Sequence, residues 1–163
     1  MNIACFPNPV LREKSKRIKN ITPEINGFIS RLKETMYTNK GCVGIAAPQA
    51  GKPLRIALVD VTGHPKAKKS RGLITLINPR ITQKSGKTIS REGCLSVPDF
   101  TGNVKRFKKI IVGYIDEKGK KKVLAASGFE AVVIQHEVDH LDGILFIDRI
   151  SNSKRDLFPR KTY

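Results

Sequence analysis

The order of β-rich and helical segments is the feature that most constrains the fold. Segments enriched in β-branched residues and bounded by Gly, Pro, Asn or Asp follow one another without an intervening helix. They span 55–61, 73–83, 86–90, 104–116 and 120–126. Residues 116–119 are typical of a hairpin turn. Because strands in a block do not alternate with helices, the sequence predicts an α+β fold and not a parallel α/β sheet.

A helix is predicted on each side of this block. The first starts at Thr22, which offers a capping hydroxyl before Pro23 and Glu24, and runs to about Gly41. The second covers 128–141. It begins with Ser127 and Glu130, a capping-box pattern, and ends before Gly143, which suits a left-handed C-terminal cap.

Length and charge limit the class of protein. The chain has 163 residues, 39% of them hydrophobic, which predicts one domain over 1–163 with its own core. Its net charge of +17 favours association with polyanions.

Three widely spaced cysteines do not resemble a disulfide framework, so we expect a reducing compartment, the cytoplasm, with an organellar origin left open. No apolar run approaches the ~20 residues of a membrane span.

The segment from His136 to His140, His-Glu-Val-Asp-His, carries the most chemistry. Two histidines four residues apart on a helix share one face, and one divalent cation can bridge them. Glu137 between them can reach a water molecule at such a site as a general base. The motif alone also fits ordinary packed or surface histidines.

A metal site needs a third ligand from elsewhere in the chain. His64 lies in a loop-like run, and we expect it to be an exposed loop residue. Cys94 is the stronger candidate because a thiolate binds zinc or ferrous iron well, although its spacing alone favours a buried, inert cysteine.

Three segments together resemble the peptide deformylase family. They are VGIAAPQ at 43–49, EGCLS at 92–96 and QHEVDH at 135–140, and the resemblance extends from PNPVLR at 7–12 to LDGILF at 141–146. It implies mixed or antiparallel β-sheets packed around a central, C-terminal metal-binding helix. The implied reaction is hydrolysis of N-formyl-methionyl peptides to formate and a free N-terminus.

The resemblance also implies roles for individual residues. Cys94, His136 and His140 would hold one divalent metal ion, Fe²⁺ under physiological conditions, with Zn²⁺, Ni²⁺ or Co²⁺ in purified protein. Glu137 would be the acid/base. The Gln49 side-chain amide and the Leu95 backbone N–H would stabilise the negative charge that develops on the formyl oxygen.

Substrate contacts are expected on both sides of the site. The peptide would add as a strand along residues 43–45, where Gly44 permits close approach. The expected contact residues are Val43, Gly44, Ile45, Gly93, Val132 and Val133. The valines are explained equally well as ordinary core. Glu92, paired with Arg106, and Gln135 are expected to orient the ligands.

The chain departs from the family pattern at two places. Cys42 stands where the family commonly has glycine, and a positive φ there would cost ~1 to 2 kcal/mol. The tail at 151–163 replaces the long C-terminal helix of many bacterial members, and Pro159 disfavours a helix there.

Two rival functions remain open from the sequence. One is a zincin-like metallopeptidase, which a cysteine ligand disfavours. The other is a basic ribosome- or RNA-binding module with a structural metal, which needs four ligands where the sequence offers three. The lysine runs fit a solvated face or an electrostatic contact with the ribosome. We expect a monomer.

Overall fold

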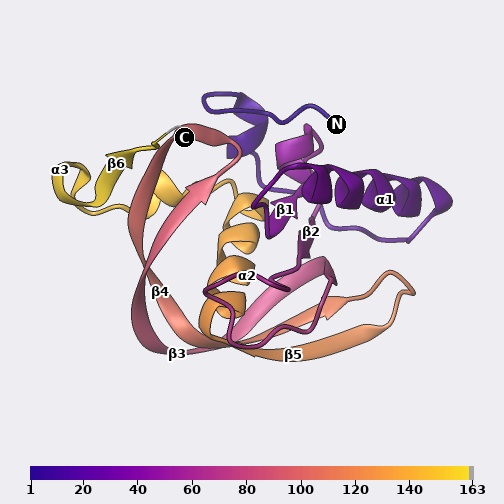
Figure 1. Cartoon of the computed structure of the whole chain (residues 1–163). Coiled ribbons are helices and arrows are strands. Elements are labelled where there is room, and N and C mark those ends of the chain that lie inside the picture. The colour runs from indigo at the N-terminus through magenta and orange to yellow at the C-terminus, as the bar shows by residue number, and fades with distance from the viewer. Residues whose placement is uncertain (162–163) are drawn as a thin grey trace.

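The computed structural model describes residues 1–161 and has the predicted α+β architecture (Figure 1). The helices are α1 (Pro23–Thr38), α2 (Gly128–Leu141) and α3 (Ser153–Asp156). The strands are β1 (Gly44–Ala46), β2 (Ile56–Val59), β3 (Ile74–Cys94), β4 (Val97–Ile115), β5 (Lys121–Ser127) and β6 (Leu157–Pro159). Single turns of 3-10 helix cover Pro9–Arg12, Ala47–Ala50 and Phe146–Arg149.

The six strands form one antiparallel sheet in the order β1-β2-β3-β4-β5, with β6 paired to β4. The prediction of two separate strands at 73–83 and 86–90 was wrong, because the single strand β3 runs unbroken through both segments. Gly86, with φ +65°, and a register shift between Ile81 and Gln83 bend the strand without ending its pairing to β4. β4 starts at Val97, earlier than predicted, because it pairs with the end of β3.

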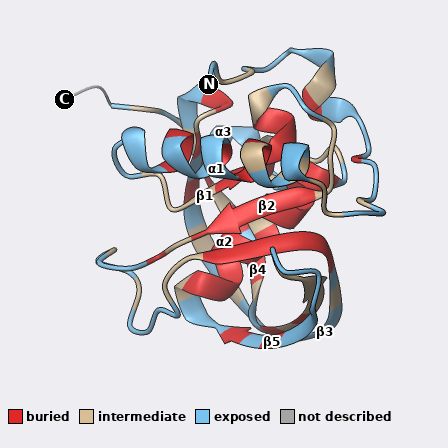
Figure 2. Ribbon diagram, turned by 90° about the vertical axis from the view of Figure 1, so that its right-hand side faces the viewer, coloured by how far each residue is buried: buried red, intermediate tan, exposed pale blue. Residues whose placement is uncertain are grey.

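Helix α2 lies inside the curve of the β3–β4 ladder and is buried along most of its length (Figures 1 and 2). A helix that is enclosed by a sheet needs apolar residues on most faces, and α2 supplies Val133, Ile134, Val138 and Leu141 to the core. The fold implied by the resemblance is therefore confirmed.

The two ends of α2 differ in how well they were predicted. Gly143 has φ +74°, which confirms the left-handed C-terminal cap. The capping box was wrong, since Ser127 makes no side-chain cap bond and Glu130 instead accepts hydrogen bonds from Arg71. The buried carboxylate thus gains two charge-assisted hydrogen bonds from Arg71, one from the backbone N–H and one from the guanidinium.

Helix α1 covers a second part of the core. Thr22 caps it through the Ile25 N–H, as predicted. Its buried face packs on β1, β2 and the start of β3, in a cluster made of Phe28, Ile29, Leu32, Met36, Ile45, Ile56, Leu58 and Ile77.

The C-terminal segment forms the single turn α3 and then β6, which pairs with Phe100–Gly102 of β4. No long helix follows α2 within residues 1–161, as Pro159 predicted. Residues 162 and 163 of the predicted domain lie outside the described residues. None of the described helices is long and apolar enough to cross a membrane.

We predict that Leu76→Ala lowers the free energy of unfolding by about 2 to 5 kcal/mol, because Leu76 is fully buried on β3. Val123→Ala on β5 should change it by about 0.5 kcal/mol or less, since Val123 is 78% exposed. Urea unfolding of both variants measures the difference, and equal effects would contradict this description of the core.

Candidate active site

Cys94, His136 and His140 come together at the centre of the molecule. Cys94 ends β3, and the two histidines lie on one face of α2. The Cys94 Sγ is 3.2 Å from His140 Nε2, and the three ligand atoms lie within 4.8 Å of one another. That spacing lets one cation reach all three at ordinary bond lengths of ~2.0 to 2.3 Å. The group therefore fits one metal ion.

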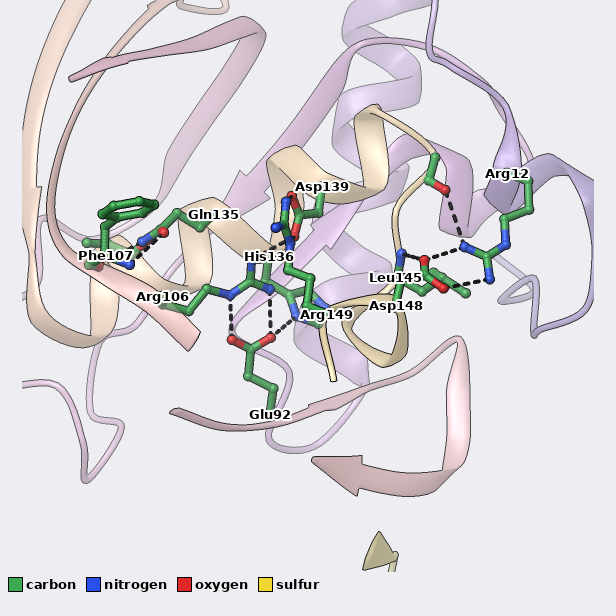
Figure 3. Close-up of polar contacts among 12 residues, drawn as sticks. Arg12, Glu92, Arg106, Phe107, Gln135, His136, Asp139, Leu145, Asp148 and Arg149 are labelled. Atoms are coloured by element: carbon green, nitrogen blue, oxygen red, sulfur yellow. Dashed lines mark hydrogen bonds and ion pairs between the residues drawn. The ribbon is translucent and has the colours of Figure 1, made fainter. Parts of the chain in front are cut away.

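Glu92 fixes the orientation of His136. Its Oε2 lies 2.8 Å from His136 Nδ1, which leaves Nε2 of that ring for a metal. Arg106 donates to both Glu92 oxygens, at 2.7 and 2.9 Å (Figure 3). Burial alone would raise the pKa of Glu92, but the hydrogen bonds from Arg106 and His136 outweigh burial and lower it to about 2. The predicted Glu92–Arg106 pair is confirmed.

Asp139 completes this network, although the sequence reasoning assigned it no role. It accepts from Arg106 Nη1 at 2.6 Å and from Arg149 Nη2 at 2.6 Å (Figure 3). The sequence signal that could have indicated this role is the position of Asp139 between the two histidines. Gln135, by contrast, makes no side-chain hydrogen bond to Cys94, His136 or His140 within residues 1–161. It bonds to the backbone of Phe107 and to Ala131 and so ties α2 to β4, which corrects the predicted orienting role.

Gln49 lies beside Cys94 with its amide held in one orientation. Its Oε1 accepts from the Ala46 N–H at 2.9 Å, so Nε2 faces the site and donates to Cys94 Sγ at 3.4 Å and Ser96 Oγ at 3.2 Å. The side chain is 2% exposed. A buried amide with a fixed N–H beside the ligand group is able to stabilise negative charge there.

Glu137 is buried next to the ligands with unused hydrogen-bonding capacity. Its Oε2 has no hydrogen-bond partner among the described residues, and neither has His140 Nδ1. Burial raises the pKa of Glu137 to about 7. A buried carboxylate oxygen without a partner is costly, so its presence beside three metal donors fits a site that binds further groups.

Gly44 is required by the close approach of Glu137. A Cβ on Gly44 would lie 2.6 Å from Glu137 Oε1 and 2.9 Å from Val133 Cγ1. The glycine thus makes room for the carboxylate.

A cleft of about 320 Å³ opens onto this group. Most residues expected to contact the substrate line it: Val43, Gly44, Gln49, Gly93, Leu95, Val132 and Val133. Ile45 does not. Its side chain is fully buried and belongs to the cluster under α1.

Two other residues of the cleft differ from the expectations. His64 is half-buried and not an exposed loop residue, because its ring stacks on Phe129 at 4.3 Å between centroids. Cys42 has an ordinary φ, since Asn78 is the one non-glycine residue of the described chain with positive φ. The left-handed position is Gly41, so Cys42 causes no backbone strain. Burial raises the pKa of the Cys42 thiol to about 12, which disfavours its oxidation.

The sequence profile of the family described as Polypeptide deformylase matches residues 1–156. The chain belongs to the peptide deformylase family. A peptide deformylase of Thermodesulfovibrio yellowstonii is 44% identical over 161 residues, which are 99% of this chain and 95% of that protein. One from Halothermothrix orenii is 48% identical over 150 residues, 92% of this chain and 93% of its own length.

Solved peptide deformylases have the same fold. The crystal structure of the Thermotoga maritima deformylase matches with a TM-score of 0.84 at 38% identity, covering 92% of this chain and 97% of that chain. A class I type b deformylase from Acinetobacter baumannii, crystallised with Met-Ala-Ser, matches with a TM-score of 0.85 at 31% identity over 91% of this chain and 96% of that one.

Family membership and the three-donor group establish the activity. The chain is a metal-dependent deformylase that removes the N-formyl group from nascent peptides. The zincin-like peptidase and the RNA-binding module with a structural metal find no support in these comparisons.

We predict that Arg106→Met lowers the free energy of unfolding by about 3 to 5 kcal/mol at pH 7, because Glu92 and Asp139 stay buried without their partner. The pKa of Glu92 is depressed in the folded wild type, so the stability from this pair is present above the unfolded pKa of ~4.3 and is lost as pH falls toward 2. The difference between the two proteins should therefore shrink on acidification.

Urea unfolding of metal-loaded protein at several pH values measures this effect. Arg155→Gln is the matched control, because its ion pair with Asp156 involves a guanidinium that is 71% exposed and should contribute about 1 kcal/mol or less. A pH-independent difference for Arg106→Met would contradict the role given to the Glu92 pair.

Proposed function

We propose that one catalytic domain performs the deformylation with Cys94, His136 and His140 as the metal ligands and Glu137 as the acid/base. The observation that carries the proposal is the unpartnered, buried Glu137 Oε2 next to a three-donor group that leaves a coordination position open. A closed structural site would have a fourth protein ligand.

The bound ion would supply Lewis acidity and lower the pKa of a water molecule. The chain supplies the proton transfers. Glu137 Oε2 takes the proton of the attacking water and delivers it to the nitrogen of the departing amine. Glu92 holds the His136 ring in one orientation throughout.

Gln49 and Leu95 act on the formyl oxygen. As the carbonyl becomes tetrahedral, that oxygen gains negative charge, and the Gln49 Nε2–H and Leu95 N–H donate to it. The Ala46 N–H already holds the Gln49 amide in place, so the formyl oxygen has only to replace Cys94 Sγ or Ser96 Oγ as the acceptor of one Nε2–H.

The formyl-methionyl peptide lies in the cleft along Val43 and the start of β1 at Gly44, and Ile45 contributes backbone only. Gly93 faces the peptide from the end of β3, and Val132 and Val133 form walls for the methionine side chain. The Acinetobacter relative was crystallised with Met-Ala-Ser bound, which supports a short peptide of this kind as a ligand of this chain.

Fe²⁺ is the proposed physiological ion. A thiolate with two imidazoles also accepts Zn²⁺, Ni²⁺ or Co²⁺, and affinity order alone does not choose among them. The resemblance to the family motifs supports Fe²⁺, so activity is to be measured on anaerobically purified protein with its metal content determined.

We predict rapid formate release from formyl-Met-Ala-Ser by such protein. Glu137→Gln should lower kcat by about 10² to 10⁴-fold while metal stays bound, because only the proton transfer is lost. Cys94→Ala should lose both metal and activity. Release by metal-replete Glu137→Gln at the wild-type rate would overturn the assignment of Glu137.

The ribosome is the proposed macromolecular partner. Exposed lysines on the β3–β4 ladder include Lys84, Lys87, Lys105, Lys108 and Lys109, and they add to the net charge of +17. Such a surface attracts ribosomal RNA without a long C-terminal helix. We further propose a monomer, since the described residues of one chain supply all three metal donors, and a cytoplasmic location, which the three widely spaced cysteines favour.

We predict that ribosome affinity falls at least about tenfold between 50 and 200 mM salt, because counterion release drives the association. Joint replacement of Lys87, Lys105 and Lys109 by Gln should weaken binding and reduce the salt dependence. Sedimentation with ribosomes measures both, and a salt-independent affinity would contradict this contact.

A further inference from the structure

The C-terminal strand β6 places the Arg160 guanidinium at the mouth of the cleft. β6 pairs with β4, the Arg91 guanidinium lies 3.5 Å from the centre of the Phe158 ring, and the Arg160 N–H donates to the Asp99 carbonyl at 2.8 Å. Figure 1 shows β6 beside β4. Backbone pairing and ring stacking therefore anchor the tail up to Arg160.

The Arg160 side chain points along the end of β3. Its Nη2 donates to the Cys94 carbonyl at 3.4 Å, and its guanidinium fills the space that a side chain on Gly93 would occupy. Gly93 is one of the residues proposed to face the peptide. The guanidinium thus lies beside the proposed path of the peptide residues that follow formyl-methionine.

The accessible charges around the cleft have one sign. Its basic lining residues are Lys40, Lys66, Arg91 and Arg160, and within residues 1–161 none of them forms an ion pair. Its acidic lining residues, Glu92 and Glu137, are both buried, and Glu92 already pairs with Arg106. The mouth therefore presents positive charge without a described counter-charge.

We propose that Arg160 determines specificity by selecting substrates with a carboxylate in the residues just after formyl-methionine. This inference rests on the proposed peptide path and deepens it. A guanidinium binds a carboxylate through two parallel N–H donors, and Lys66 and Arg91 strengthen the local field. The carboxylate is either an Asp or Glu side chain or the C-terminus of a short peptide.

A purely structural role makes a different prediction. Arg160 could instead only support the Cys94 turn through its bond to the Cys94 carbonyl. Its loss would then lower the metal content of the protein, or lower kcat by the same factor for every peptide. A specificity role changes KM, and only for acidic peptides.

The test compares amidated formyl-Met-Ala-Asp, formyl-Met-Ala-Asn and formyl-Met-Ala-Lys on metal-loaded wild type, Arg160→Gln and Lys154→Gln. Lys154 lies exposed in the same tail away from the cleft, so its variant controls for net charge. Formyl-Met-Ala-Ser with free and amidated ends tests the terminal carboxylate separately.

We expect wild type and Lys154→Gln to favour Asp over Asn by about three- to tenfold in kcat/KM, chiefly through KM, with less preference at high salt. Arg160→Gln should reduce the ratio toward one while its kcat for the Asn peptide stays unchanged. An unchanged ratio, or a uniform loss of kcat with lost metal, overturns the proposal. Failure of wild type to hydrolyse any formyl peptide would instead refute the proposed function.

Discussion

The ion pairs of Arg106 with Glu92 and Asp139 hold the metal-binding helix against the sheet. They join β3, β4 and α2 in a region where all three side chains are buried. Moving α2 along the sheet would separate buried charges, at a cost of several kcal/mol. Because Glu92 also contacts His136, the same ion pairs set the orientation of a metal ligand. The fold and the ligand geometry thus depend on one set of contacts.

The cleft follows from this arrangement. With α2 held inside the β3–β4 ladder, its ligand face lies between the end of β3 and the edge of β1. Gly44 lets β1 approach closely enough for Glu137 to be buried beside the ligands. A water-poor site strengthens electrostatic interactions, which suits a reaction that develops charge on a carbonyl oxygen.

The C-terminal segment of the described residues contributes to the same site. Where a long helix would leave the sheet, β6 turns back and pairs with β4. Strand pairing brings this segment to the cleft, where Arg160 lies with its backbone N–H bonded to the Asp99 carbonyl. The positive charge of this protein is thus partly local to the mouth of the cleft and partly spread over the β3–β4 ladder.

The sequence by itself determined the features that depend on near neighbours in the chain. The Thr22 cap, the Gly143 cap and the helical spacing of His136 and His140 follow from contacts within a few residues. The family motifs identified Cys94 as the third metal ligand. Tertiary structure alone decided that Asp139 meets Arg106, that His64 stacks on Phe129, that β3 continues through Gly86 and that Arg160 enters the cleft. Those contacts join residues far apart in sequence, and chain topology and burial decide which of them form.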